Sequence, residues 1–198
     1  MTPFESISTK GLIKNHYTQS VLFTESECSE ILKYCTDLIQ TNWSVRLDGM
    51  YSEIGCSLKY QDLHDYYNED TKWFFERVMD WAADILDIKW KNPPHGGFRK
   101  YDIGDYFIKH KDNVAKVGAA ERYFTMSIQL TDGKLYDGCD IIADDNFIFQ
   151  KEIGNVILWG ANIAHEITQL KSGERSSLVF FSDTNHVDIK KTFSTKNI

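Results

Sequence analysis

His110 and Asp112 stand two residues apart in the segment FRKYDIGDYFIKHKDNV. On a β-strand, side chains two residues apart project to the same face, so both could bind one metal ion while Lys109 and Lys111 point the other way. A mononuclear Fe(II) site built from two histidines and one carboxylate needs a third ligand and keeps further positions open. His165, in the segment NVILWGANIAHEI, is the best candidate because it lies on a later predicted strand.

Arg175 and Ser177 follow His165 by ten and twelve positions, in the segment GERSSLVFF on the last predicted strand. A guanidinium group binds a carboxylate through two parallel hydrogen bonds, and a serine hydroxyl on the same face adds a third. This pair therefore predicts an anchor for a co-substrate that carries a carboxylate. Each signal is weak alone, because strand histidines are more often only hydrogen-bonded and isolated arginines usually lie at the surface.

Helices are predicted in the first half of the chain. Thr24 and Glu27 form a capping box in front of an amphipathic segment, which predicts a helix over 25–40. A second helix is predicted over about 70–86, where apolar residues recur at helical spacing before Pro93 and Pro94. The apolar residues of this second segment are Trp73, Phe74, Val78, Trp81, Ala82 and Ile85.

From residue 98 onward, short runs rich in β-branched and aromatic residues alternate with glycine or aspartate turns. Helices early and strands late predict an α+β chain, with a double-stranded β-helix (jelly roll) core over about 98–183 and N-terminal helices over about 20–90. Residues 1–198 are expected to form a single domain, with a loosely held polar tail from 186 onward. The predicted strands cover about 98–102, 106–112, 123–130, 139–143, 146–150, 155–159, 164–168 and 176–182.

Composition restricts the function classes. The net charge of -7 argues against broad attraction to nucleic-acid phosphates, so a nucleic-acid partner is not expected. No apolar run approaches the ~20 residues needed to span a bilayer, and the N-terminus lacks a signal-peptide pattern. We therefore expect a cytoplasmic protein without a membrane partner, and composition does not indicate its oligomeric state. The cysteines form no CxxC pair and predict reduced, mostly buried thiols: Cys28, Cys35, Cys56 and Cys139.

The ordered motifs HxD, distal histidine and RxS resemble the prolyl 4-hydroxylase-like branch of the Fe(II)/2-oxoglutarate-dependent oxygenases. The resemblance covers about residues 98–183 and, more faintly, 24–38. It implies that His110, Asp112 and His165 bind Fe(II). It also implies that Arg175 pairs with the distal carboxylate of 2-oxoglutarate, with Ser177 assisting.

Two further residues are expected near the co-substrate. Tyr101 falls nine positions before His110, where members of this branch often place an aromatic hydroxyl group, although a tyrosine that simply packs on its strand is an equal alternative. Gln129 lies on the polar face of the alternating segment RYFTMSIQL and is expected to line the pocket. Both residues are therefore assigned to co-substrate binding.

The resemblance implies a dioxygenase that uses O2, converts 2-oxoglutarate to succinate and CO2, and hydroxylates its substrate, with ascorbate as a candidate reductant. Hydroxylation is expected rather than halogenation, because related halogenases replace the carboxylate ligand by a small residue and Asp112 is present here. The branch favours a peptidyl substrate, prolyl among others, and a free amino acid or another small molecule is a close alternative.

Two departures argue against a collagen-like substrate. Cys139 stands where members often carry the second glycine of a GG pair, and Arg175 stands where collagen-type enzymes carry lysine. The stretch 43–68, which is rich in tyrosine, is expected to be a lid over the mouth of the jelly roll, with ordinary connecting structure as the alternative.

Three alternative functions remain at this stage. A non-enzymatic, cupin-like metal-binding module has no need for the carboxylate anchor, which argues against it. Nucleic-acid demethylation is the second, but alkyl-base repair oxygenases carry a second arginine six positions beyond the anchor, where this chain has Phe181. The third is a zinc site that uses the same three ligands.

Overall fold

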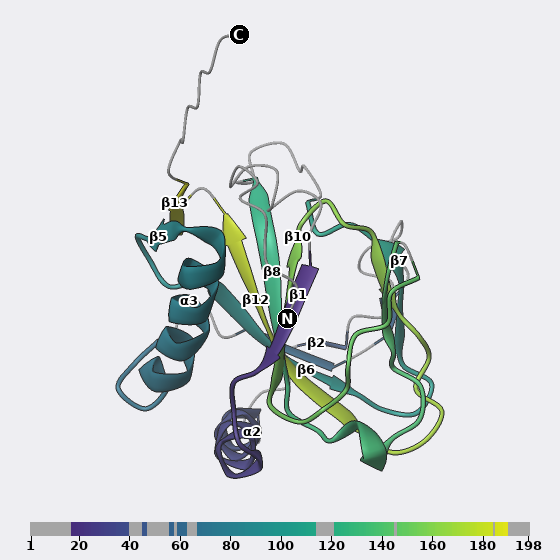
Figure 1. Cartoon of the computed structure of the whole chain (residues 1–198). Helices are drawn as coiled ribbons and strands as arrows, with labels where there is room; N and C mark the ends of the chain where they lie inside the picture. Colours follow the sequence, from purple (N-terminus) through teal and green to yellow (C-terminus); the bar gives the residue numbers. More distant parts are fainter. Residues whose placement is uncertain are drawn as a thin grey trace, which may run out of the picture.

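The computed structural model describes residues 17–39, 45–46, 56–57, 59–62, 67–113, 121–144, 146–183 and 185–189. In this part of the chain, two helices pack on one face of a large sheet, and a smaller sheet lies on the other side (Figure 1). The expected α+β composition is confirmed in this coarser form, as a jelly-roll-like β-sandwich with two helices. No described helix is long and apolar enough to cross a membrane.

The large sheet has the strand order β1-β10-β8-β12-β6-β4-β2, the small sheet has the order β3-β7-β11-β9, and β13 pairs with β5. Every neighbouring pair is antiparallel. The elements are β1 (Tyr17–Val21), α2 (Glu25–Ile39), β2 (Val45–Arg46), β3 (Cys56–Ser57), β4 (Lys59–Asp62), α3 (Lys72–Leu86), β5 (Ile88–Trp90), β6 (His95–Tyr101), β7 (Tyr106–His110), β8 (Arg122–Gln129), η1 (Gly133–Leu135), β9 (Ile141–Ala143), β10 (Asn155–Gly160), β11 (His165–Ile167), β12 (Arg175–Asp183) and β13 (Val187–Ile189).

Both predicted helices are present. At the start of α2, the Thr24 backbone N–H donates to the Glu27 carboxylate at 2.9 Å, and the Glu27 N–H donates to the Thr24 hydroxyl at 3.3 Å, as a capping box requires. Helix α3 ends at Leu86, and the next residue, Asp87, caps it in a left-handed conformation at φ 46°. Its inner face buries Phe74, Phe75, Val78, Ala82 and Leu86, while Trp73, Trp81 and Ile85 pack at the edge of that core.

The alternating strands of the large sheet separate a core from a polar interior. On β8 and β12, every second side chain points toward the helices and joins the core that α2 and α3 cover, namely Phe124, Met126, Ile128, Leu178 and Phe180. The intervening residues face the small sheet and include buried polar groups: Thr125, Ser127, Gln129, Arg175 and Ser177. One face of the sheet therefore stabilises the fold, and the other carries polar side chains between the two sheets.

The structure differs from two of the sequence predictions and leaves most of a third outside the described residues. The strand predicted over 146–150 is wrong: Asn146 has φ 63°, and Ile148 makes only an isolated bridge with Ile142. The tail is not loosely held at its start, because β13 pairs with β5 and His186 is buried; residues 190–198 lie outside the described residues. The expected lid over 43–68 also lies outside them, apart from Tyr67, Asn68 and the short backbone segments of β2, β3 and β4.

Gly154 directly precedes strand β10 and contacts the residues that lead into α2. Its φ is 78°, its N–H donates to the Gln129 carbonyl at 2.9 Å, and its own carbonyl accepts from Leu22 at 3.0 Å. A Cβ at this position would lie 1.8 Å from the carbonyl oxygen of Phe23. Gly154→Ala is therefore expected to lower the free energy of unfolding by about 2 kcal/mol or more.

Urea unfolding measures this change, and Gly104→Ala is a matched control. Gly104 also has a positive φ, 96°, but a Cβ there would meet no atom within 4 Å. The control therefore carries the backbone penalty without the steric clash. Equal losses of stability in the two variants would contradict the predicted contact with Phe23.

Candidate active site

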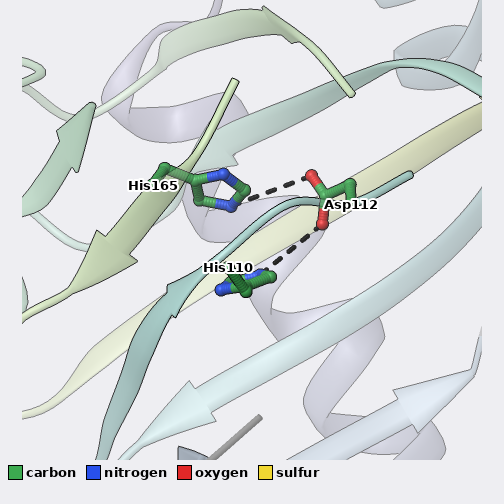
Figure 2. A group of neighbouring side chains, drawn as sticks. All are labelled: His110, Asp112 and His165. Atoms are coloured by element: carbon green, nitrogen blue, oxygen red, sulfur yellow. Dashed lines mark ion pairs between the residues drawn. The ribbon is translucent and has the colours of Figure 1, made fainter. Parts of the chain in front are cut away.

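His110 and His165 lie side by side because β7 and β11 are neighbours in the small sheet and these two residues are register partners. Asp112 lies two residues beyond the end of β7, in a bend, so the prediction that it lies on the strand itself is wrong. His110 Nε2 is 3.6 Å from one carboxylate oxygen of Asp112, and His165 Nε2 is 3.8 Å from the other (Figure 2). Because the three ligand atoms lie within 4.8 Å of one another, they could bind one metal ion.

The two imidazole rings are oriented by backbone carbonyls. His110 Nδ1 lies 2.8 Å from the carbonyl oxygen of Ile108, and His165 Nδ1 lies 3.1 Å from that of Ile163. A carbonyl oxygen only accepts hydrogen bonds, so each Nδ1 donates a proton there. In the neutral ring, this leaves the Nε2 lone pair free to bind a metal.

Asp112 is held by two side chains from the large sheet. The Thr125 hydroxyl donates to its Oδ2 at 2.6 Å, and Trp159 Nε1 donates to the same oxygen at 2.9 Å. Although burial alone would raise the pKa of Asp112, the charges of His165 and His110 and the Thr125 hydrogen bond hold it well below its usual range. Burial also lowers the pKa of His165, despite the opposing charge of Asp112. Ionised Asp112 and neutral His165 are the forms that bind metals.

The Trp159 hydrogen bond yields a testable expectation. Trp159→Phe keeps the ring but removes the donor that fixes Asp112. Hydrogen bonds to metal ligands typically contribute about 10–100-fold to metal affinity, and a loss of that size is expected in an anaerobic Fe(II) titration. Trp90→Phe is the matched control, because the Trp90 indole donates to the Met79 carbonyl in the helix-covered core. Equal Fe(II) affinity in the two variants would show that Trp159 does not position the carboxylate.

Arg175 lies in a cluster of buried polar side chains between the sheets. It is 1% exposed, and its Nε and Nη2 donate to Gln129 Oε1 at 3.2 and 3.0 Å. Tyr101 is its register partner on β6, and Ser177 pairs with Gln129 across β8. The structure thus brings together the four residues predicted around the co-substrate: Tyr101, Gln129, Arg175 and Ser177.

Several polar atoms of this cluster are buried and have no hydrogen-bond partner within the described part of the chain. They include Arg175 Nη1, the Tyr101 hydroxyl and the Ser177 hydroxyl. Leaving a buried donor unpaired costs about 1–3 kcal/mol, and more for a charged group. These donors therefore fit an anionic ligand that accepts hydrogen bonds from them.

Gln129 orients Arg175 through its own contacts. The Gln129 amide Nε2 donates to the Tyr136 hydroxyl and, at 3.1 Å, to the Thr131 carbonyl. With its amide nitrogen held in this way, its oxygen faces the guanidinium group. Gln129 therefore holds one edge of the Arg175 guanidinium group.

Residues to which the sequence had assigned no role complete the site. Thr125 lies on the polar face of β8 that alternation predicts, but no sequence pattern marked Trp159 or Tyr136. Two arginines lie against the Phe181 ring, with the Arg99 guanidinium carbon 5.5 Å and that of Arg122 3.9 Å from the ring centroid. The alternation of side chains along a strand could have indicated Arg99, because it stands two residues before Tyr101 on β6 and therefore points to the same face.

The predicted reduced thiols are confirmed for Cys28, Cys35 and Cys139, which are free and buried, whereas the Cys56 side chain lies outside the described part of the chain. Burial raises the pKa of Cys139 to about 11 and those of Cys28 and Cys35 to about 12. At neutral pH these groups are therefore protonated and unreactive.

No protein-family model and no curated protein sequence matches this chain. It is similar in structure to the viral collagen prolyl hydroxylase from Paramecium Bursaria Chlorella virus-1 in its 2-oxoglutarate complex, with a TM-score of 0.62, 12% identity and coverage of 83% of this chain and 94% of that one. A Trichoplax adhaerens prolyl hydroxylase, in complex with a hypoxia inducible factor peptide fragment, has a TM-score of 0.63, 16% identity and coverage of 88% and 87%.

The chain is also similar in structure to an enzyme of another kind. The non-heme alpha ketoglutarate dependent epimerase SnoN from nogalamycin biosynthesis has a TM-score of 0.65 and 14% identity, covering 88% of this chain and 80% of its own. At these identities the likeness shows the fold alone. The chain therefore has the fold of the prolyl 4-hydroxylases and other 2-oxoglutarate-Fe(II) oxygenases, with a His-Asp-His group in its interior.

Proposed function

We propose that this protein is an Fe(II)- and 2-oxoglutarate-dependent dioxygenase that hydroxylates a peptidyl side chain, prolyl among others, or a small molecule. One observation carries the proposal: a buried His-Asp-His group and a buried arginine with an unpartnered Nη1 occupy the same interior. A metal-binding module has no need for the arginine. A dicarboxylate co-substrate bound beside a metal needs both.

His110, Asp112 and His165 would hold the iron, because two imidazoles and one carboxylate suit Fe(II) and leave positions open for other ligands. Iron and 2-oxoglutarate together supply the activation of O2, coupled to formation of succinate and CO2. The protein holds the three ligands ready: carbonyl groups fix the imidazole tautomers, and Thr125 and Trp159 fix the carboxylate. Asp112 supplies an anionic ligand, which favours hydroxylation over halogenation.

Arg175 would bind the distal carboxylate of 2-oxoglutarate through its unpartnered Nη1, with the hydroxyl groups of Ser177 and Tyr101 as further donors. Gln129 occupies the other edge of the guanidinium group and limits the directions in which Arg175 can point. The interior is closed to bulk water at this point, so an unpaired carboxylate or guanidinium would be costly. Charge complementarity therefore selects a dianionic co-substrate.

The proposal is tested by reconstituting the metal-free protein with Fe(II) without oxygen and then adding 2-oxoglutarate. A metal-to-ligand absorption band should form, and admitting O2 should release succinate. Peptide and amino-acid pools should accelerate that release when they contain the substrate, and ascorbate should sustain it if it acts as the reductant. Absence of the band in the iron-loaded parent would contradict the proposed co-substrate, and a preference for Zn(II) without turnover would favour the zinc alternative.

A further inference from the structure

We infer that Arg99 is a second carboxylate-binding residue of this site and that the substrate is a small carboxylic acid, which Arg99 binds next to the metal position. This inference rests on the proposed function and narrows its substrate class. It assigns to Arg99 an anion distinct from the one that Arg175 binds.

Arg99 lies between the two sheets, on the side that faces the metal centre. On β6 it shares a face with Tyr101, whereas its neighbour Phe98 joins the helix-covered core on the opposite face. Its guanidinium carbon is 5.9 Å from the centroid of the Phe107 ring, which stacks on His110 at 4.0 Å. Arg99 therefore lies two residues before Tyr101 on the same face of β6, and Phe107 separates its guanidinium group from the His110 ring.

Arg99 is half-buried, but its Nε lies in the interior, where a donor needs an acceptor. Its Nε is buried without a hydrogen-bond partner, and within the described part of the chain Arg99 makes no ion pair with a carboxylate. Lys100, the next residue, faces the other side of the sheet and pairs with Glu174. Within the described part of the chain, the outer cation therefore has a carboxylate partner and the inner one has none. An enclosed donor without an acceptor is costly unless a ligand supplies one.

A count of charges shows that the co-substrate does not supply this partner. The iron dication and Arg175 carry the same total charge as Asp112 and dianionic 2-oxoglutarate, with opposite sign, so these four balance. The buried groups nearest Arg175 do not compensate Arg99, because burial raises the pKa values of Tyr101, Tyr136 and Cys139 and keeps them neutral. Among the described residues, no carboxylate pairs with Arg99, so its positive charge is left for another anion.

The free Nε indicates the kind of anion. A guanidinium group offers Nε–H and a neighbouring Nη–H on one edge, and a planar carboxylate matches that edge with two oxygens. Arg122, which also contacts the Phe181 ring, adds positive potential on the same side and donates weakly to the Asp112 carbonyl at 3.5 Å. A free amino acid, whose carboxylate binds Arg99 while another carbon faces the metal, has the required chemistry.

The experiment compares acids with their neutral amides. The parent protein, loaded with Fe(II) and 2-oxoglutarate without oxygen, is titrated with each of the common L-amino acids and with its primary amide. Binding is followed by the perturbation of the absorption band and by the thermal unfolding midpoint. At least one acid should bind about tenfold or more tightly than its amide, since hydrogen bonds to a charged group contribute about 10–100-fold.

Arg99→Gln should remove the preference for that acid over its amide and leave 2-oxoglutarate affinity within about twofold of the parent. Arg99→Lys should retain part of the preference, because the charge remains but the planar edge is lost. Lys100→Gln is the matched control: it removes a neighbouring cation from the outer face and should retain the preference in full.

Two results would overturn the inference. One is a parent protein that binds no acid better than its amide. The other is an Arg99→Gln variant that weakens 2-oxoglutarate rather than the acid, which would place the guanidinium group on the co-substrate. Formation of the 2-oxoglutarate band in the parent without any amino acid tests the proposed function separately. If that band fails to form, thermal shifts of the metal-free protein with the same acid and amide pairs still test Arg99.

Discussion

Arg175→Ala is expected to weaken 2-oxoglutarate binding to the Fe(II)-loaded protein by about 3–5 kcal/mol, as when one partner of a buried charge pair is removed. The co-substrate is a dianion, and its distal carboxylate would enter a site where the Arg175 side chain is 1% exposed. Without the guanidinium group, that carboxylate loses its hydration and gains no cation. The metal-to-ligand absorption band, titrated without oxygen, measures the affinity directly.

Two further substitutions separate charge from geometry. Arg175→Lys should recover only part of the affinity, because a point charge cannot reproduce the guanidinium fork that faces Gln129 on one edge and the ligand on the other. Ser177→Ala removes one hydroxyl donor, which has no partner among the described residues, and should cost about 1.5–3 kcal/mol at most. Fe(II) affinity should hardly change in any of these variants. Unchanged 2-oxoglutarate affinity in Arg175→Ala would exclude this co-substrate assignment and favour the metal-binding module.

The regions that local signals define were predicted well. The capping box at Thr24 placed the start of α2, and helical spacing found α3, because both signals act within a few residues. Strands β6, β7, β8, β9, β10, β11 and β12 overlap predicted runs, since enrichment in β-branched and aromatic residues is also a local signal. The short edge strands were missed, because their pairing partners lie far away in sequence: β1 pairs with β10, and β13 pairs with β5.

The same distinction holds in the site. The HxD spacing and the later histidine could be found in the sequence, because strand parity and residue type are visible there. The contacts that hold Asp112 could not, since Thr125 and Trp159 are 13 and 47 positions away and reach it only when the two sheets face each other. Alternation along β6 also indicated that Arg99 shares a face with Tyr101, but its buried Nε without a hydrogen-bond partner is visible only in the structure.

Loss of any of the three proposed ligands should reduce Fe(II) affinity by more than about a hundredfold, beyond the 10–100-fold expected for loss of a hydrogen bond to a ligand. His110 and His165 each provide one Nε2, and Asp112 provides the only carboxylate among them, so every single substitution leaves a two-point site. Anaerobic Fe(II) titration of His110→Ala, His165→Ala and Asp112→Ala measures this loss. His95→Ala is the control, because that exposed side chain lies at the far end of β6.

The three variants should differ in the stability of the metal-free protein. Asp112→Ala leaves the Thr125 hydroxyl and the Trp159 indole without their acceptor in a buried position, which costs about 1–3 kcal/mol for each donor. His165→Ala removes a ring whose Nδ1 partner is a single backbone carbonyl, so it should cost less. Urea unfolding of the metal-free proteins distinguishes the two effects. A folded His165→Ala variant that binds Fe(II) as tightly as the parent would show that His165 is not the third ligand.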